Sequence, residues 1–161
     1  MAFKTVGAEA VETHIDDLAP LLGTTFGPGE WHEVDQELID EFSDVTGDHA
    51  WYHVDRERAL AELPDGKTIA HGLLTLALVP ALFGQVFRLG YSGRGLNYGY
   101  DRLRFIAPVQ SGDRIRLAAI PSEITPHARG SVVRVGLTVE IERDAQVALV
   151  TDQLLFVLAA A

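Results

Sequence analysis

The chain has 161 residues, of which 47% are hydrophobic and 22% are charged, a composition typical of one soluble globular domain rather than a disordered or fibrous protein. Thirteen basic and 23 acidic side chains give a formal net charge of −10, which disfavours nonspecific binding to nucleic acid or to anionic membranes. The sequence has no cysteine, so disulfides, thiolate nucleophiles and cysteine-ligated metals are excluded.

No targeting or membrane segment is visible in the chain. The N-terminal residues lead into a polar stretch rather than a continuous apolar core, so no secretory signal is expected. The longest apolar stretch, residues 73–87, is shorter than the ~20 residues of a membrane span. It is interrupted by Thr75, Pro80, Gly84 and Gln85. We therefore expect a cytoplasmic protein with one domain over residues 1–161, of which residues 1–24 are an N-terminal extension.

The first half of the chain carries helical periodicity. Residues 8–22 fit a short amphipathic helix, and residues 31–34 fit a short strand. Asp35 is typical of a helix N-cap and Gly47 of a helix stop. The apolar positions between them recur at helical spacing: Leu38, Ile39, Phe42 and Val45. This pattern predicts a surface helix with one buried face.

A second short helix is expected to begin after Asp55, which is again a suitable N-cap, and to end at residues 64–66. Its expected inner face consists of Ala59, Leu60 and Leu63. Residues 47–54, between these two helices, are predicted to form a loop. From Gly72 to about residue 89 the chain is apolar on nearly every side, which predicts one long helix buried in the core of the domain.

The second half of the chain has the period of two that is typical of strands. Alternation is clearest from Val133 to Ile141, and turn signals lie at residues 111–113, 126–130 and 143–145. Four long strands are predicted, near residues 96–106, 113–124, 131–143 and 146–158. Helices followed by a run of antiparallel strands indicate an α+β fold, with the sheet curled around the apolar helix.

The segment Thr46 to Asp55 concentrates acids, histidines and aromatic residues between two helices. A carboxylate and an imidazole that share one water could perform acid–base chemistry near neutral pH, and Asp48 and His53 are such a pair. The alternative is structural, with Asp48 capping a turn and His53 beginning a helix. His49 and His53 are four residues apart and could both face zinc if helical, but the glutamate of a metalloprotease motif is absent, so no metal is expected.

His71 and Gly72 stand at the start of the apolar helix. Backbone amides at a helix N-terminus carry partial positive charge and suit an oxyanion, although His71 could equally be a helix-start residue bonded to a nearby carbonyl. No Walker loop, dinucleotide fingerprint or serine-hydrolase elbow occurs. The chemistry that remains is the transfer of water and protons.

Several motifs resemble one known family. They are Thr46-Gly47-Asp48-His49 through His53-Val54-Asp55, Ile69-Ala70-His71-Gly72, and Arg104-Phe105-Ile106-Ala107-Pro108-Val109 with Gly112-Asp113. Together they resemble the MaoC-like (R)-specific enoyl-CoA hydratases, over about residues 25–158. Asp48-His49-Ala50-Trp51-Tyr52-His53 and Asn97-Tyr98-Gly99-Tyr100 look most like the NodN-type single-domain branch.

The resemblance implies a hotdog fold, in which an antiparallel sheet wraps a long helix, and a homodimer. It also implies that Asp48 and His53 activate water and that the amide of Gly72 receives the thioester oxygen. The expected reaction adds water to a trans-2-enoyl-CoA, with coenzyme A as part of the substrate and without a cofactor. Arg94, Arg102 and Arg104 are candidates for binding coenzyme A, since an acidic protein must supply cations locally.

Two positions depart from the family pattern. Ala50-Trp51 stands where the more common loop has Asn-Pro, and Ala77 stands where many members have serine. Two other functions are therefore considered. One is a hotdog thioesterase, which would hydrolyse the thioester and usually lacks the spacing between Asp48 and His53. The other is a catalytically silent acyl-binding subunit.

Overall fold

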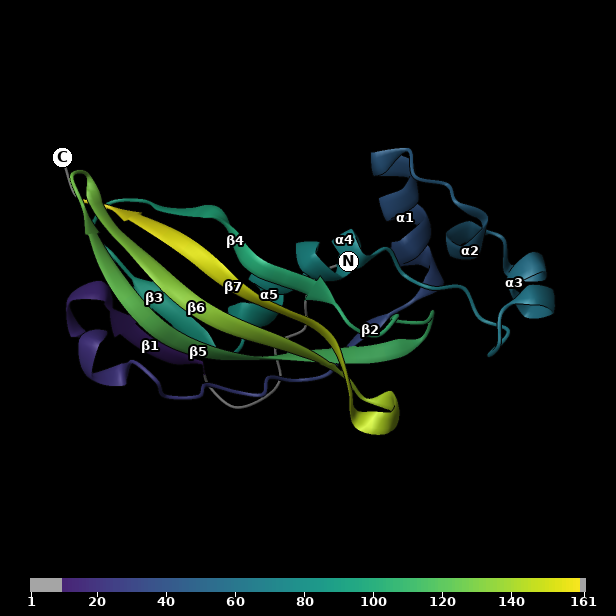
Figure 1. Ribbon diagram of the computed structural model, residues 1–161, viewed down its shortest axis with the longest axis horizontal. Coiled ribbons are helices and arrows are strands. Elements are labelled where there is room, and N and C mark those ends of the chain that lie inside the picture. The colour runs from purple at the N-terminus through teal and green to yellow at the C-terminus, as the bar shows by residue number, and fades with distance from the viewer. Residues whose placement is uncertain (1–9, 160–161) are drawn as a thin grey trace.

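The computed structural model describes residues 10–159 and has a five-stranded antiparallel sheet that curves around short helices (Figure 1). The strand order in the sheet is β2-β5-β6-β7-β4. The strands are β2 His32–Val34, β4 Gly95–Phe105, β5 Asp113–His127, β6 Gly130–Ile141 and β7 Gln146–Leu158. A separate parallel pair joins β1 Val11–His14 to β3 Phe87–Gly90. The α+β class expected from the sequence is confirmed.

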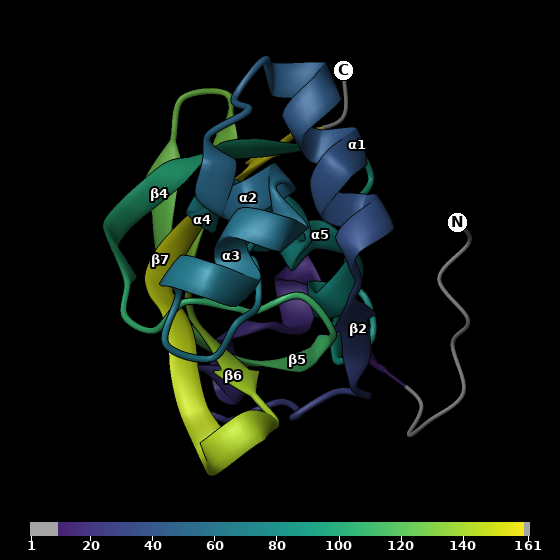
Figure 2. The same cartoon turned by 90° about the vertical axis from the view of Figure 1, so that its right-hand side faces the viewer.

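The helices within residues 72–83 lie against the inner face of the sheet, whereas those within residues 36–62 gather at one end of the molecule (Figures 1 and 2). They are α1 Gln36–Thr46, α2 Trp51–Val54, α3 Arg56–Glu62, α4 Gly72–Ala77 and α5 Val79–Phe83. The core lies between α4, α5 and the inner face of the sheet. That face includes the predicted alternating row of β6, whose members are at most 2% exposed: Val133, Val135, Leu137, Val139 and Ile141. The four predicted long strands and the short strand near residues 31–34 are thus confirmed.

The helix predicted over residues 8–22 is wrong where the structure describes it. Val11–His14 forms β1 and pairs with β3, and two short 3-10 turns follow at Ile15–Asp17 and Ala19–Leu21. Pro20 lacks the N–H that a continuing helix requires, and pairing with β3 satisfies the preceding backbone instead. Leu18 nevertheless enters the core with no exposed surface. The absence of a secretory signal was predicted from the first residues of the chain, and these lie outside the described residues.

The single long helix predicted from Gly72 to about residue 89 is also wrong. The chain forms α4 and α5 with a break at Leu78, and then turns into the strand β3. Pro80 lies in the first turn of α5, where the missing N–H costs no helical bond, so the sequence begins a new helix there. Nor is this segment buried on every side, because Leu73 is 60% exposed.

The helix ends at Asp35, Gly47 and Asp55 are confirmed. Asp35 Oδ1 accepts a bond from Leu38 N at 2.9 Å, and Asp55 Oδ1 one from Arg58 N at 2.9 Å. Three details differ from the prediction. Residues 51–54 form the helical turn α2 instead of a loop. Two residues predicted on inner helix faces, Val45 and Leu60, are exposed. Among residues 10–159 no helix is long and apolar enough to cross a membrane.

Candidate active site

The loop after α1 brings Asp48 to the surface beside α2. Gly47 ends α1 with φ of 74°, a left-handed conformation that glycine adopts without steric cost. The chain then turns sharply, and Asp48 Oδ1 accepts a weak bond from Ala50 N at 3.4 Å. The predicted turn-capping role of Asp48 is thus present. Its side chain is still 57% exposed, so a carboxylate oxygen remains available to water or to a ligand.

His53 lies under this loop, with only 6% of its surface exposed. Its Nδ1 is 2.6 Å from the main-chain oxygen of Ile69. A carbonyl oxygen only accepts, so Nδ1 carries the hydrogen and the neutral ring keeps a lone pair on Nε2. The pKa of His53 is lowered from its ordinary value, and burial is the largest cause. The hydrogen bond to Ile69 opposes this shift. The charge interaction with His71 lowers the pKa further, and the one with Asp48 raises it. The lowered pKa keeps the ring neutral, in the form that accepts a proton.

His71 immediately precedes α4 and is 4% exposed. Its Nε2 lies 2.9 Å from the main-chain oxygen of Asp48 and 3.9 Å from Asp48 Oδ2. Ser43 Oγ, on α1, is 3.5 Å from the same nitrogen. The ring also stacks on His53, with centroids 3.7 Å apart and planes inclined by 25°. His71 therefore joins α1, the Asp48 loop and α2.

Asp48, His53 and His71 form a candidate catalytic cluster, called the catalytic cluster below, in which one nitrogen or oxygen from each side chain lies within 4.8 Å of the others. Two histidines and a carboxylate could in principle bind a metal. However, Nδ1 of His53 and Nε2 of His71 each face a carbonyl oxygen, so both carry a hydrogen and neither offers a lone pair to a metal. The arrangement therefore fits a shared water better than a metal ion. His49 lies apart from the cluster, 4.0 Å from Asp44.

Gly72 is the first residue of α4, so its amide belongs to the end of a helix where N–H groups lack intrahelical partners. A Cβ at this position would lie 2.9 Å from Cγ of Phe105, which projects from β4. A side chain at Gly72 would therefore displace Phe105, apart from any role of the Gly72 amide in binding substrate.

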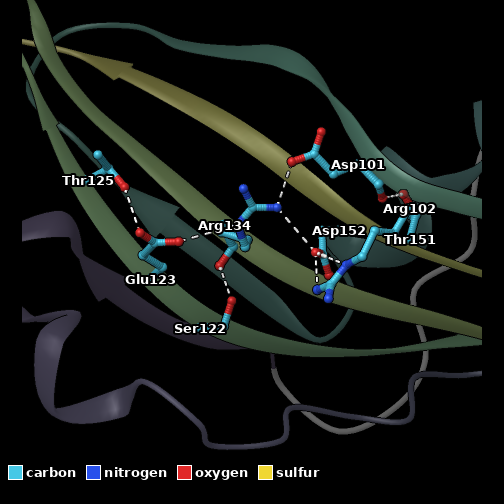
Figure 3. A network of polar contacts seen from close by, with 8 residues as sticks. All are labelled: Asp101, Arg102, Ser122, Glu123, Thr125, Arg134, Thr151 and Asp152. Atoms are coloured by element: carbon cyan, nitrogen blue, oxygen red, sulfur yellow. Dashed lines mark hydrogen bonds and ion pairs between the residues drawn. The ribbon is translucent and has the colours of Figure 1, made fainter.

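The three predicted arginines do not converge on the catalytic cluster. Arg102 Nε donates to Asp152 Oδ2 at 2.8 Å, within a network that also joins Arg134, Asp101 and Glu123 (Figure 3). Arg104 is exposed and donates to the main-chain oxygen of Leu103. It directly precedes Phe105, whereas Arg94 lies at the other end of β4, where its oxygen accepts from Leu158 N.

An apolar pocket of about 250 Å³ lies between α5, β3 and the beginning of β4. It is lined mainly by Pro80, Phe83, Phe87, Leu89, Leu96 and Leu155. Because α5 follows α4 almost directly, the pocket lies farther along the same helical segment that begins at the catalytic cluster.

Sequence reasoning placed Asp48, His53 and His71 on two separate motifs and assigned no contact between His53 and His71. It missed the main-chain oxygen of Ile69 and the hydroxyl of Ser43. The Ile69 oxygen lies within a motif that the sequence already marked, residues 69–72. No sequence signal pointed to Ser43, since a serine on the buried face of a helix is common.

Comparison with known proteins identifies the family. The model of the MaoC like domain matches residues 17–142. The chain belongs to the MaoC-like family. It is 40% identical to 3-hydroxyacyl-thioester dehydratase Z of Mycobacterium tuberculosis over 141 residues, which cover 87% of this chain and 93% of that protein. It is also 41% identical to Nodulation protein N of Rhizobium leguminosarum bv. viciae over 143 residues, 88% of this chain and 89% of that protein.

Solved structures of other proteins share the fold of this MaoC-like chain. The unliganded R-hydratase from Pseudomonas aeruginosa superposes with a TM-score of 0.69 at 23% identity, covering 86% of this chain and 83% of that one. The (R)-hydratase from A. caviae involved in PHA biosynthesis gives 0.67 at 16% identity, covering 84% and 96%. The hotdog fold is thereby confirmed, although its central helix is divided into α4 and α5.

Proposed function

We propose that this protein is an (R)-specific enoyl-CoA hydratase, which adds water to a trans-2-enoyl-CoA and, in reverse, dehydrates a 3-hydroxyacyl thioester. The observation that carries the proposal is the position of His53, whose Nδ1 is bonded to the main-chain oxygen of Ile69 and which has a ring nitrogen within 4.8 Å of an oxygen of the Asp48 carboxylate. The 40% identity to a protein named 3-hydroxyacyl-thioester dehydratase supports the reaction class.

In the proposed mechanism, Asp48 and neutral His53 hold one water molecule between them. The cluster removes a proton as the water oxygen bonds to Cβ of the enoyl thioester, and a proton is delivered to Cα. The product gains the elements of one water and no other group. General acid–base catalysis of this kind typically contributes ~10²–10⁴-fold to the rate. Neither a metal nor a cofactor takes part in the proposal.

Negative charge develops on the thioester oxygen while Cβ is attacked, and it requires a hydrogen-bond donor. We assign this role to the amide of Gly72, at the start of α4, beside His71 in the catalytic cluster. Removing an oxyanion donor typically costs ~10²–10³-fold in turnover. The preceding residue, His71, supplies its ring to the cluster rather than to the oxyanion.

We assign the acyl chain to the apolar pocket between α5 and the beginning of β4, because its lining is suited to hydrocarbon. For the phosphates of coenzyme A, Arg104 is the preferred cation of the three predicted arginines. It is exposed and adjoins Phe105, which contacts Gly72. Arg102 is already neutralised by Asp152, and Arg94 lies at the opposite end of β4.

We further propose that the protein is a homodimer joined along β4. β4 is the last strand of the five-stranded sheet, so one of its edges has no neighbouring strand among the described residues. Unpaired strand edges favour association with another strand. Large apolar side chains that are at least 47% exposed lie on or directly after this strand: Leu96, Tyr98, Phe105 and Ile106. A second copy would cover both the edge and these side chains.

The test is incubation with a short and a long trans-2-enoyl-CoA while alkene absorbance and free thiol are followed together. Loss of alkene without thiol release is expected of the hydratase, and chiral analysis of the product should give the (R)-3-hydroxyacyl-CoA. Thiol release would instead establish a thioesterase. Binding of the acyl-CoA with neither change would indicate a silent acyl-binding subunit.

A further inference from the structure

His71 makes contacts that a helix-start residue does not need. All hydrogen-bonding contacts of its side chain among the described residues run through Nε2, to the main-chain oxygen of Asp48 and to Ser43 Oγ. Its ring contacts the rings of Phe42, at 5.1 Å, and His53, at 3.7 Å, measured between centroids. We infer that His71 is a positioning residue, which fixes the Asp48 loop and the His53 ring relative to each other. The inference rests on the proposed hydratase function.

The first contact fixes the position of Asp48. The main-chain oxygen of Asp48 accepts, so Nε2 of His71 donates to it at 2.9 Å. The other hydrogen bonds of Asp48 are local and long: its N donates to Thr46 Oγ1 at 3.4 Å, and its Oδ1 accepts from Ala50 N at 3.4 Å. The bond from the buried His71 ring is thus the shortest of these hydrogen bonds of Asp48.

The second contact fixes the ring plane of His53. The ring of His53 is attached through Cβ and bonded to Ile69 through Nδ1, and held at these two points it can still tilt about the line between them. Stacking on His71 at 3.7 Å removes this freedom and leaves Nε2 pointing in one direction. Both reacting groups are therefore oriented by one side chain that is itself 4% exposed.

The remaining nitrogen of His71 distinguishes positioning from proton relay. Nδ1 is buried and has no hydrogen-bond partner in the described part of the chain. A relay needs a donor or acceptor at both ring nitrogens, so that a proton accepted at one can leave from the other. With side-chain partners at Nε2 alone among the described residues, the contacts of His71 favour orienting its neighbours over passing a proton onward.

Two variants of His71 test this inference. His71→Gln keeps an N–H group near the place of Nε2, whereas His71→Leu has similar bulk and no donor. For folded His71→Leu, verified by circular dichroism, we expect kcat with crotonyl-CoA to fall on the order of 10²-fold, the effect of a misplacement of about 1 Å. KM should change little, and His71→Gln should recover most of the lost kcat. His49→Gln, in the same loop but outside the cluster, is the matched control and should keep wild-type activity.

The pH profile gives a readout that a purely structural role would not move. The charged or titratable groups that face His53 are Asp48 from the loop, His71 from the start of α4 and Tyr52 from its own helix. The charge interaction with His71 lowers the pKa of His53. Its removal in His71→Leu should therefore move the acidic limb of kcat/KM to higher pH. A folded His71→Leu variant with wild-type kcat and an unmoved acidic limb would overturn the inference.

Nitrogen-15 NMR of the imidazole rings tests the same geometry without any turnover. In the wild-type protein at neutral pH we expect His71 to carry its hydrogen on Nε2 and His53 on Nδ1, with single-histidine variants assigning the signals. A hydrogen on Nδ1 of His71 would overturn the inference even if the protein is a hydratase. If crotonyl-CoA is not hydrated but the expected tautomers are found, the proposed function fails and the positioning geometry stands. This measurement also decides the matter if His71→Leu does not fold.

Discussion

Gly72 lies directly beneath the ring of Phe105: a Cβ added to Gly72 would be 2.9 Å from Cγ and 3.0 Å from both Cδ atoms of that ring. These residues come from two separate sequence motifs, one at the start of α4 and one at the end of β4. The contact joins the proposed oxyanion donor to the edge strand of the sheet. It also gives the glycine a packing role that must be separated from its proposed role in catalysis.

Gly72→Ala alone and combined with Phe105→Ala separates these roles. Phe105 is 47% exposed and can move aside, so the single Gly72→Ala variant should fold with a somewhat lower melting temperature, and the double variant should regain stability. If the thioester approaches the Gly72 amide closely, the double variant should remain at least ~10-fold less active than Phe105→Ala, because the methyl group still obstructs the donor. If the double variant is as active as Phe105→Ala, Gly72 has a packing role only.

Asp48→Asn and His53→Gln should each reduce turnover of crotonyl-CoA by at least ~10²-fold while the circular dichroism spectrum is unchanged. The double variant should be little worse than either single one, because two groups that act on one water are not additive. His49→Gln serves as the control for changes in the loop. Turnover near that of the wild type in either single variant would contradict the mechanism.

Activity should decline only below the ordinary histidine pKa. Burial lowers the pKa of His53 from 6.5, so the neutral base persists at neutral pH and is protonated only at a lower pH. The acidic limb of kcat/KM should therefore lie below pH 6.5 in the wild-type protein. An acidic limb above that pH would contradict the lowered pKa.

The same shift links His53 to the stability of the fold. Below pH 6.5 the unfolded chain binds a proton at this histidine before the folded chain does, so the free energy of unfolding should fall as pH decreases through the folded-state pKa. Burial also lowers the pKa of His32, which adds a dependence of the same sign. Urea unfolding should therefore show that His53→Gln loses less stability on acidification than the wild-type protein does. Some loss should remain because of His32.

Ile106→Glu should disrupt the proposed dimer. Ile106 is 59% exposed and directly follows β4, so a second copy pairing along that edge would bury the new charge, which is costly without a partner. Sedimentation should show a dimer of the wild-type protein at micromolar concentration and a shift of the variant toward the 17.5 kDa monomer. Leu60→Glu, at a residue 74% exposed on α3, is the matched control and should remain dimeric.

The arginine network of Figure 3 should support stability rather than substrate binding. Asp152, whose side chain is 10% exposed, accepts from both Arg102 and Arg134, so Asp152→Asn should lower the free energy of unfolding by about 1–2 kcal/mol. Arg102→Ala should leave KM for crotonyl-CoA unchanged, whereas Arg104→Ala should raise it. If KM rises in Arg102→Ala and not in Arg104→Ala, Arg102 rather than Arg104 binds coenzyme A.

Local rules were sufficient for the elements whose signals are local. The caps at Asp35 and Asp55, the stop at Gly47 and the four long strands were predictable, because a capping side chain or an alternating face acts over a few residues. The motifs around Asp48 and His71 were likewise visible in the sequence, and they indicated the MaoC-like family before any contact was known.

Tertiary contacts decided the rest. Residues 11–14 form a strand because they pair with β3. Glu12 pairs with Arg88, which lies 76 residues later in the chain. The stacking of His53 on His71 depends on the packing of α1, α2 and α4, which no spacing along the chain encodes. Sequence alone indicated the groups proposed to carry the chemistry, whereas only the fold decided that Ile69 sets the tautomer of His53 and that Arg102 is bound by Asp152. Both facts concern hydrogen bonds between residues distant in sequence, and their partners are chosen by packing.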